Sequence, residues 1–413
     1  MDRLRPVLPI RCRPGTALAI LFLVNTLNFY DRLALGAIVE PVRREFGLTD
    51  TQVGALVTWF TVVFAVAGLP LGRLADSGSR RRLLAGGVAL WGGLTALSGA
   101  ASGYAMLLAT RLGVGIGEAV CAPVATSWIA DLVPASRRAR AMAAFMFAIP
   151  VGGLLSYSIT GPVAQAYGWR AALAIAGAPT LVLAPLILRL SEPARGSGVR
   201  GQGSGVGWAA KGFAWICASG AVINFALYGF STFLPAFLTR YHGVSIARAG
   251  VWMGVGTGVS GIAAAAAVWA LGDRVTNRLR LCAVTSLLAT LPLTAAVGMA
   301  PGDAAAAIWL AMVGYGLLQM YYGLVYAAIQ DRVAPDSRAT AMALYLVVTY
   351  LGGASWGPMV MGRASDWLAR QAAGAGPLTE AARATGLHGA MYLIPGLAVV
   401  LSWVLWMAAR RSA

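Results

Sequence analysis

The chain repeats the stretch Arg138-Ala139-Arg140-Ala141-Met142-Ala143 as Arg338-Ala339-Thr340-Ala341-Met342-Ala343, with each residue number raised by 200. The pair Gly152-Gly153 returns at the same offset as Gly352-Gly353. Self-similarity at a fixed offset indicates an internal duplication. We therefore predict that the chain folds as two equivalent halves.

Most of the chain is apolar. Hydrophobic residues make up 58% of the 413 residues and charged residues only 11%, too few charges to cover a soluble protein of this length. The apolar residues form blocks near the length of about 20 residues that a helix needs to cross a bilayer. Each block should be helical, because an unpaired backbone amide in lipid costs several kcal/mol. Twelve blocks are predicted, near residues 16–38, 51–71, 83–101, 104–130, 140–162, 171–190, 212–238, 247–271, 280–299, 304–329, 339–361 and 387–409.

The predicted fold is an all-α membrane protein with two pseudo-symmetric six-helix bundles, an arrangement typical of transporters. Residues 1–190 form the N-terminal bundle, residues 191–211 a cytoplasmic linker rich in Gly, Ser and Arg, and residues 212–413 the C-terminal bundle. A second long loop is expected at about 363–386, on the side opposite the termini, and it contains Asp366.

The basic residues follow this topology. The net charge is +17, from 32 Lys and Arg against 15 Asp and Glu. Of the basic residues outside the helices, 22 fall on the side of both termini and eight on the other side. Cytoplasmic loops carry the excess of positive charge, so both termini are predicted to be cytoplasmic. The arginines occur in every second loop and are not clustered on one amphipathic face. We therefore expect them to contact anionic lipid headgroups and not nucleic acid.

Nothing in the sequence indicates catalysis. The only histidines, His242 and His388, lie near predicted loops or helix ends, and the chain contains no GxSxG run and no P-loop. The four cysteines lack the spacing of metal ligands. We therefore expect no enzyme activity, no cofactor and no metal, and a chain that acts as a monomer.

The loop after the second predicted helix reads Gly72-Arg73-Leu74-Ala75-Asp76-Ser77-Gly78-Ser79-Arg80-Arg81-Arg82. It resembles the GxLaDrxGrr loop of the major facilitator superfamily, with Ser77 in place of that family's Arg after Asp. In such a loop the glycine lets two helices approach, and the acid caps a neighbouring helix or pairs with an arginine, which clamps this side in one state. The residues expected to act here are Gly72, Asp76, Arg80 and Arg81.

Other motifs resemble those of Spinster-like transporters. The stretch Asn25-Thr26-Leu27-Asn28-Phe29-Tyr30-Asp31-Arg32 is similar to their NxxNYxDR signature, and Arg111-Leu112-Gly113-Val114-Gly115-Ile116-Gly117-Glu118-Ala119 to their fourth helix. The second half adds Gly362 and Ser365-Asp366. This resemblance implies proton-linked movement of lipids, lysolipids or related amphiphiles. Anion:cation symporters also carry Asp-Arg in the first helix, so that pair alone does not decide.

Four ionisable residues lie inside the predicted apolar blocks: Asp31, Arg32, Arg111 and Glu118. A charge at the centre of a spanning helix costs about 3 kcal/mol or more, so such residues face the bundle interior and tend to be functional. Asn28, Asp31 and Arg32 share one face of the first helix, and Arg111 and Glu118 share one face of the fourth, two turns apart. In a superfamily bundle both helices line the central cavity, so the two faces can meet there.

This cluster has two interpretations. The first is a purely structural ion network. The second is a proton switch, in which Glu118 is the main protonation site, Asp31 is the second candidate, and Arg32 and Arg111 gate or tune the two carboxyl groups.

Polar residues at helical spacing also mark the second half. Tyrosine rings combine an apolar face with a hydroxyl group, which suits an amphiphilic ligand. Each residue alone is better explained by packing, but as a set we predict that they line the substrate cavity. The predicted lining residues are Asn28, Asn224, Tyr228, Tyr315, Gln319 and Tyr322.

The predicted function is therefore proton-coupled secondary active transport of an amphiphilic or lipid-like small molecule by alternating access. The expected partners are that substrate, protons and membrane lipids. The alternatives are an organic-anion or sugar-acid symporter, a drug-type exporter of the same superfamily, or a non-transporting receptor. An anion carrier needs a cavity arginine without a carboxylate partner, whereas each arginine here has an acid nearby. Abundant Ala and Arg indicate a bacterial protein, so we expect it in the inner membrane.

Overall fold

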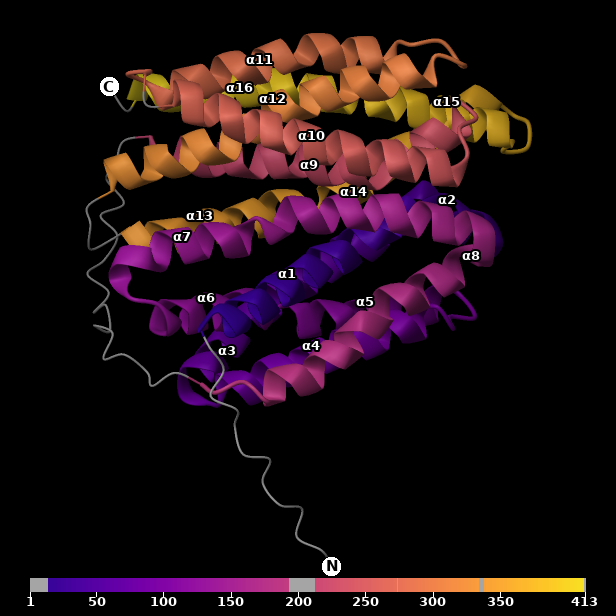
Figure 1. The fold of residues 1–413 in the computed structure, drawn as a ribbon. Coiled ribbons are helices and arrows are strands. Elements are labelled where there is room, and N and C mark those ends of the chain that lie inside the picture. Colours follow the sequence, from indigo (N-terminus) through magenta and orange to yellow (C-terminus); the bar gives the residue numbers. More distant parts are fainter. Residues whose placement is uncertain (1–13, 193–211, 273, 334–337, 412–413) are drawn as a thin grey trace, which may run out of the picture.

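The computed structural model describes residues 14–192, 212–272, 274–333 and 338–411, and its regular structure there is helical (Figure 1). The first half contains α1 (Pro14–Ala37), α2 (Val39–Phe46), α3 (Asp50–Ser77), α4 (Arg80–Ser98), α5 (Tyr104–Glu118), α6 (Cys121–Leu132), α7 (Ala135–Met146) and α8 (Ala148–Leu188). The second half contains α9 (Phe213–Arg240), α10 (Ile246–Leu271), α11 (Arg278–Val297), α12 (Ala304–Arg332), α13 (Arg338–Thr349), the π-helical turn η2 (Tyr350–Ala354), α14 (Gly357–Ala373), α15 (Glu380–Met391) and α16 (Leu393–Arg411).

Ten segments among the described residues are long and apolar enough to span a bilayer. One of them, Ser136–Leu188, contains two spans, because Gly168 has non-helical backbone angles (φ 84°) that break it. Helix α4 is not one of the ten, but it has 19 residues and packs against α5 and α8. Together these segments make up the twelve-helix, all-α membrane fold, which confirms the prediction from sequence.

The fourth predicted span is confirmed as one apolar segment, Tyr104–Leu132, in which a short turn separates the end of α5 at Glu118 from the start of α6 at Cys121. One predicted loop is wrong. The expected loop at 363–386 is mostly helical, because α14 continues to Ala373 and α15 begins at Glu380. Arg363, Asp366 and Arg370 of this stretch lie on α14, which packs against α3, and Asp366 is buried there.

The internal repeat falls at equivalent places in the two halves. Residues 138–143 lie in α7, and residues 338–343 lie in α13. We call the side on which α8 ends and α9 begins the linker side, and the side on which α3 and α10 begin the distal side. Both repeated stretches lie at the linker side, each before a glycine pair, Gly152-Gly153 in α8 and Gly352-Gly353 in η2.

The two halves pack against each other mainly at the distal side. There α3 packs on α14, and α8 packs on α10. By contrast, among the described residues α6 and α7 make their extensive helix contacts within the first half, and α13 makes its own within the second. Figure 1 shows the helices of each half gathered on opposite sides of this junction. The structure is thus closed at the distal side and separated at the linker side.

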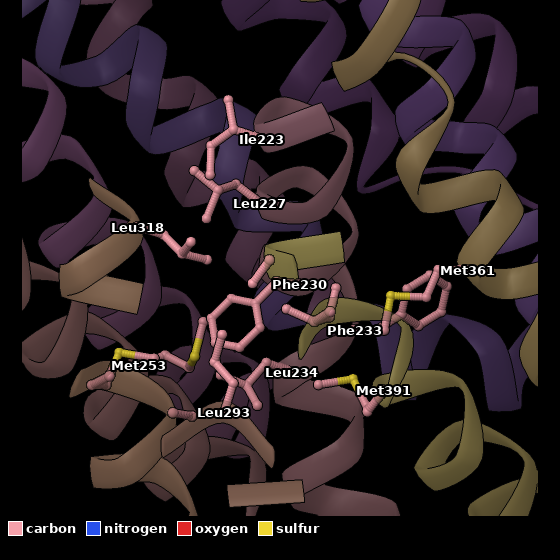
Figure 2. Packing of buried hydrophobic residues seen from close by; sticks show 14 of the residues in the cluster. Ile223, Leu227, Phe230, Phe233, Leu234, Met253, Leu293, Leu318, Met361 and Met391 are labelled. Atoms are coloured by element: carbon pink, nitrogen blue, oxygen red, sulfur yellow. The ribbon is translucent and has the colours of Figure 1, made fainter. Parts of the chain in front are cut away.

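The second half has an apolar core next to this junction. Phe230 and Leu234 of α9 pack with Met253 of α10 and Leu293 of α11 (Figure 2). All four side chains are buried. In lipid, where surrounding acyl chains are equally apolar, close packing rather than removal from water stabilises such contacts.

Candidate functional site

The four charged residues of α1 and α5 form two crossed ion pairs. Arg32 Nη2 lies 3.1 Å from Glu118 Oε2, and Arg111 Nη1 lies 3.4 Å from Asp31 Oδ1. Asp31, Arg111 and Glu118 are each at most 1% exposed. The neighbours Asp31 and Arg32 therefore each take a partner from α5, and the two faces of these helices do meet.

Other polar groups extend this cluster. Thr95 of α4 donates a hydrogen bond of 2.9 Å to Asp31 Oδ2, and Arg32 Nη2 donates one of 3.4 Å to Asn28 Oδ1. Thr95 escaped the sequence analysis, because a lone threonine in an apolar helix carries no ionisable signal. No described residue donates a hydrogen bond to Glu118 Oε1, although this atom is buried. Buried acceptors without a donor are rare and often mark functional sites.

Aromatic rings surround Arg32. Its guanidinium carbon lies 4.2 Å from the centre of the Phe64 ring and 5.1 Å from that of Phe29. Phe64 in turn contacts Tyr350 of the second half, with ring centres 5.9 Å apart, and Tyr350 contacts Tyr228 at 6.4 Å. Cation–π contacts of this kind hold a guanidinium without neutralising it. Arg32 is thus held by the first half, and the aromatic contacts continue into the second.

The predicted lining residues of the second half form separate groups. Tyr228 belongs to the aromatic contacts beside Arg32. Tyr322 donates a hydrogen bond of 3.0 Å to Asn224, whereas Gln319 donates one of 3.2 Å to Tyr315. Tyr315 also stacks on the core residue Phe230, with ring centres 5.6 Å apart. Phe64 and Tyr350 were missed, although Phe60 and Phe64 occupy one face of α3 at a spacing of four residues.

The loop between α3 and α4 is tied to the ends of other helices. Arg80 Nη1 lies 2.6 Å from Asp131 Oδ2 of α6, and its side chain is 1% exposed. The backbone nitrogen of Arg81 donates a hydrogen bond of 2.7 Å to Glu192. The expected close approach at Gly72 is absent here, since a Cβ built there would have its nearest neighbour, Pro123, 4.0 Å away. The side chain of Asp76 lies outside the described part of the chain.

Glu192 shows why this loop is well anchored. Besides Arg81, its carboxylate accepts a hydrogen bond from the hydroxyl group of Ser79, the N-cap residue of α4. Burial raises the pKa of Glu192, but these two hydrogen bonds and the charges of Arg80 and Arg81 outweigh burial and lower the pKa. The ionised carboxylate therefore joins the end of α8 to the start of α4.

Comparison with known proteins agrees with this architecture. Residues 21–358 match the family model of the Major Facilitator Superfamily. An MFS-type efflux pump of Mycolicibacterium smegmatis is 34% identical over 97% of this chain and 93% of its own length. The sphingosine-1-phosphate transporter SPNS2 of Danio rerio is 28% identical over 87% of this chain and 78% of its own.

Among solved structures, a bacterial homologue of the human lysosomal transporter Spinster, in an inward-facing and occupied conformation, is 27% identical. It superposes with a TM-score of 0.87 over 97% of each chain. The fold and these matches define a membrane transporter rather than an enzyme. The chain belongs to the Major Facilitator Superfamily and is a Spinster-like member of it.

Proposed function

We propose that the protein couples proton movement to the transport of an amphiphilic or lipid-like molecule by alternating access. The observation that carries this proposal is the buried pair of Arg32 and Glu118. These two charged groups lie beside aromatic rings supplied by both halves. A change in the relative position of the halves would therefore alter the surroundings of the pair directly.

The proposed coupling follows from the charge balance. Two carboxylates and two guanidinium groups leave the buried cluster neutral. If Arg32 moves away from Glu118, that carboxylate remains buried with an unpaired charge, and taking up a proton removes the cost. Glu118 would accordingly bind a proton when its ion pair with Arg32 breaks, and it would release that proton when the pair forms again as the halves move. Asp31, held by Arg111 and Thr95, is the second candidate for protonation.

We further propose that the linker side is cytoplasmic and that the protein lies in a bacterial inner membrane with both termini inside. The excess of arginine in the loops of that side supports this orientation. In this orientation the structure faces inward, because the distal side is closed. The similarity to an inward-facing Spinster homologue supports the same state.

Two observations favour an amphiphilic cargo. Tyr228 and Tyr350 contribute aromatic rings that carry hydroxyl groups beside the cluster, and a relative is named as a transporter of sphingosine-1-phosphate. Each arginine of the cluster has a carboxylate partner, which disfavours a small organic anion or sugar acid held by a free arginine. A drug-type exporter is the second candidate, because another relative is named as an efflux pump.

Glu118→Gln tests the coupling. In proteoliposomes with an imposed pH gradient, we expect the variant to lose gradient-driven transport of a labelled lysolipid, because a glutamine cannot exchange a proton. The matched control is Glu45→Gln, since Glu45 is exposed in α2 and 42% of its side chain is accessible. Gradient-driven flux that persists at the parent rate in Glu118→Gln would remove this residue from the mechanism.

The cargo class needs a separate measurement. We expect lysolipids to raise the melting temperature of the purified protein, since a ligand that binds only the folded state stabilises it. Sugar acids and cationic dyes serve as the competing ligand classes. Stabilisation by a dye alone would favour the drug exporter, and stabilisation by a sugar acid alone would favour the symporter.

A further inference from the structure

A second buried charge cluster joins the two halves at the distal side. Its members come from segments that are far apart in sequence, and all of them except the exposed Glu380 are largely buried. None belongs to the transport cluster described above. From the first half come Glu40, Arg43 and Asp50, and from the second half come Arg240, Asp366 and Glu380.

Arg240 is the cation at the centre of this cluster. It ends α9, and its side chain is 1% exposed. Its Nη2 and Nη1 atoms lie 2.7 and 2.8 Å from the two carboxylate oxygens of Asp50, and its Nε lies 2.6 Å from Glu40 Oε2. Bidentate pairs of this geometry are among the strongest hydrogen bonds in proteins. Both partners of Arg240 belong to the other half.

Asp366 caps a helix that belongs to the other half. Its carboxylate accepts hydrogen bonds from the backbone nitrogens of Asp50 and Thr51, at 3.0 and 2.8 Å, and from the Thr51 hydroxyl at 2.6 Å. These are the first two residues of α3. The first backbone N–H groups of a helix lack partners within it, and its N-terminus favours a negative charge. The N-cap residue Thr49 accepts a hydrogen bond only from the backbone nitrogen of Gln52. The backbone N–H groups of Asp50 and Thr51 are therefore available to Asp366.

The backbones around these bonds are in direct contact. A Cβ at Gly54 would overlap the carbonyl group of Pro358, and a Cβ at Gly362 would overlap that of Asp50. Because α3 and α14 are in contact at both glycines and Asp50 and Arg240 are buried, the charges that cross the junction interact at a lower dielectric than in water. Any separation of the halves here must break the bonds of Arg240 and Asp366 together.

We propose that Asp50, Arg240 and Asp366 form a distal latch, and that its release is a required step of the transport cycle. Opening the distal side separates Asp50 from Arg240 and removes the carboxylate from the start of α3. Glu40 keeps a partner in its own half, because Arg43 Nη2 lies 2.9 Å from it. The latch therefore sets how often the protein opens to the distal side, whatever cargo it carries.

A buried cysteine can report how often the latch opens. Thr58 lies one turn after Gly54 on α3 and is 0% exposed. In a variant whose native cysteines are replaced by serine, Thr58→Cys would react with a charged, membrane-impermeant maleimide only when this junction separates. The alkylation rate of protein in nanodiscs then scales with the open population, and alkylation in SDS checks the intrinsic reactivity of the thiol.

Asp366→Asn should raise this alkylation rate at least about tenfold, because it removes the negative charge that accepts three hydrogen bonds across the junction. The matched control is Asp303→Asn, since Asp303 is exposed at the distal end of α12 and should leave the rate unchanged. A rate for folded Asp366→Asn within twofold of the parent would overturn the proposal.

A milder variant keeps the test decisive if Asp366→Asn does not fold. Thr51→Val removes only the hydroxyl bond to Asp366 and should raise the rate about threefold. An unchanged rate in Thr51→Val would then count against the latch. Neither measurement requires transport, so the latch can fail while the proposed function stands, and the reverse also holds.

Discussion

The two junctions between the halves have the same backbone design but different chemistry. At one, α3 meets α14 through Gly54 and Gly362; at the other, α10 meets α8 through Gly250 and Gly161. In both, a side chain from the facing half caps the start of a helix. Asp366 caps α3 with three hydrogen bonds, whereas Gln165 accepts one bond of 2.9 Å from the backbone of Ala247 in α10.

The two junctions show that the duplicated halves share their backbone contacts but not the charge of the capping side chain. The glycine contacts and the caps recur because they depend on backbone geometry that both halves share. Among the described residues, the cap is charged at the α3–α14 junction, where it is the carboxylate of Asp366, and neutral at the α8–α10 junction, where it is the amide of Gln165. A charged junction responds strongly to the loss of one partner, and a neutral one does not. The following predictions test this asymmetry.

Arg240→Gln should have the largest effect. The substitution leaves Asp50 and Glu40 buried without their shared cation, a loss that typically costs about 3–5 kcal/mol. We expect the Thr58→Cys alkylation rate to rise about a hundredfold or more. The control is Arg248→Gln, because Arg248 is an exposed arginine of α10 at the same side. A rise below tenfold in folded protein would show that the ion pairs contribute little to closure.

Gln165→Glu should change the neutral junction in the opposite direction. It places a carboxylate at the start of α10, where a negative charge at a partly exposed helix N-terminus stabilises by about 0.3–1 kcal/mol. A cysteine at Gly258, where a Cβ has room beside Leu154, reports this junction. We expect alkylation there to slow by about two- to fivefold, with Gln165→Ala near the parent rate. Faster alkylation in Gln165→Glu would mean that the two caps are not equivalent.

Acid should produce the smallest effect within the physiological range. Burial raises the pKa of Glu40, but hydrogen bonds from Arg43 and the charges of Arg240 and Arg43 outweigh it and lower the pKa from 4.5 to about 2. The contribution of Glu40 to closure is therefore complete above about pH 4.5 and is lost as the pH falls toward 2. We expect a constant Thr58→Cys alkylation rate, corrected for thiolate content, between pH 8 and 5. An increase already at pH 6 would contradict this assignment.

Sequence patterns were sufficient for the spanning helices, because a block of apolar residues in lipid has only the helix as a stable form. They failed where charge and helix coexist, as in α14: Asp366 fits the pattern of a loop, but it lies on a helix that packs against α3. Asp31, Arg32, Arg111 and Glu118 were found because charges within apolar blocks are rare.

The sequence by itself determined a duplicated, twelve-helix membrane protein with its positive charge on one side, because hydropathy and charge act residue by residue along the chain. Only the tertiary structure decided which acidic side chain pairs with which arginine. The crossing of the pairs in α1 and α5, the aromatic surroundings of Arg32, and the capping of α3 by Asp366 each depend on side chains that are brought together across the fold. Contacts of that kind arise from how helices pack, and no local pattern encodes them.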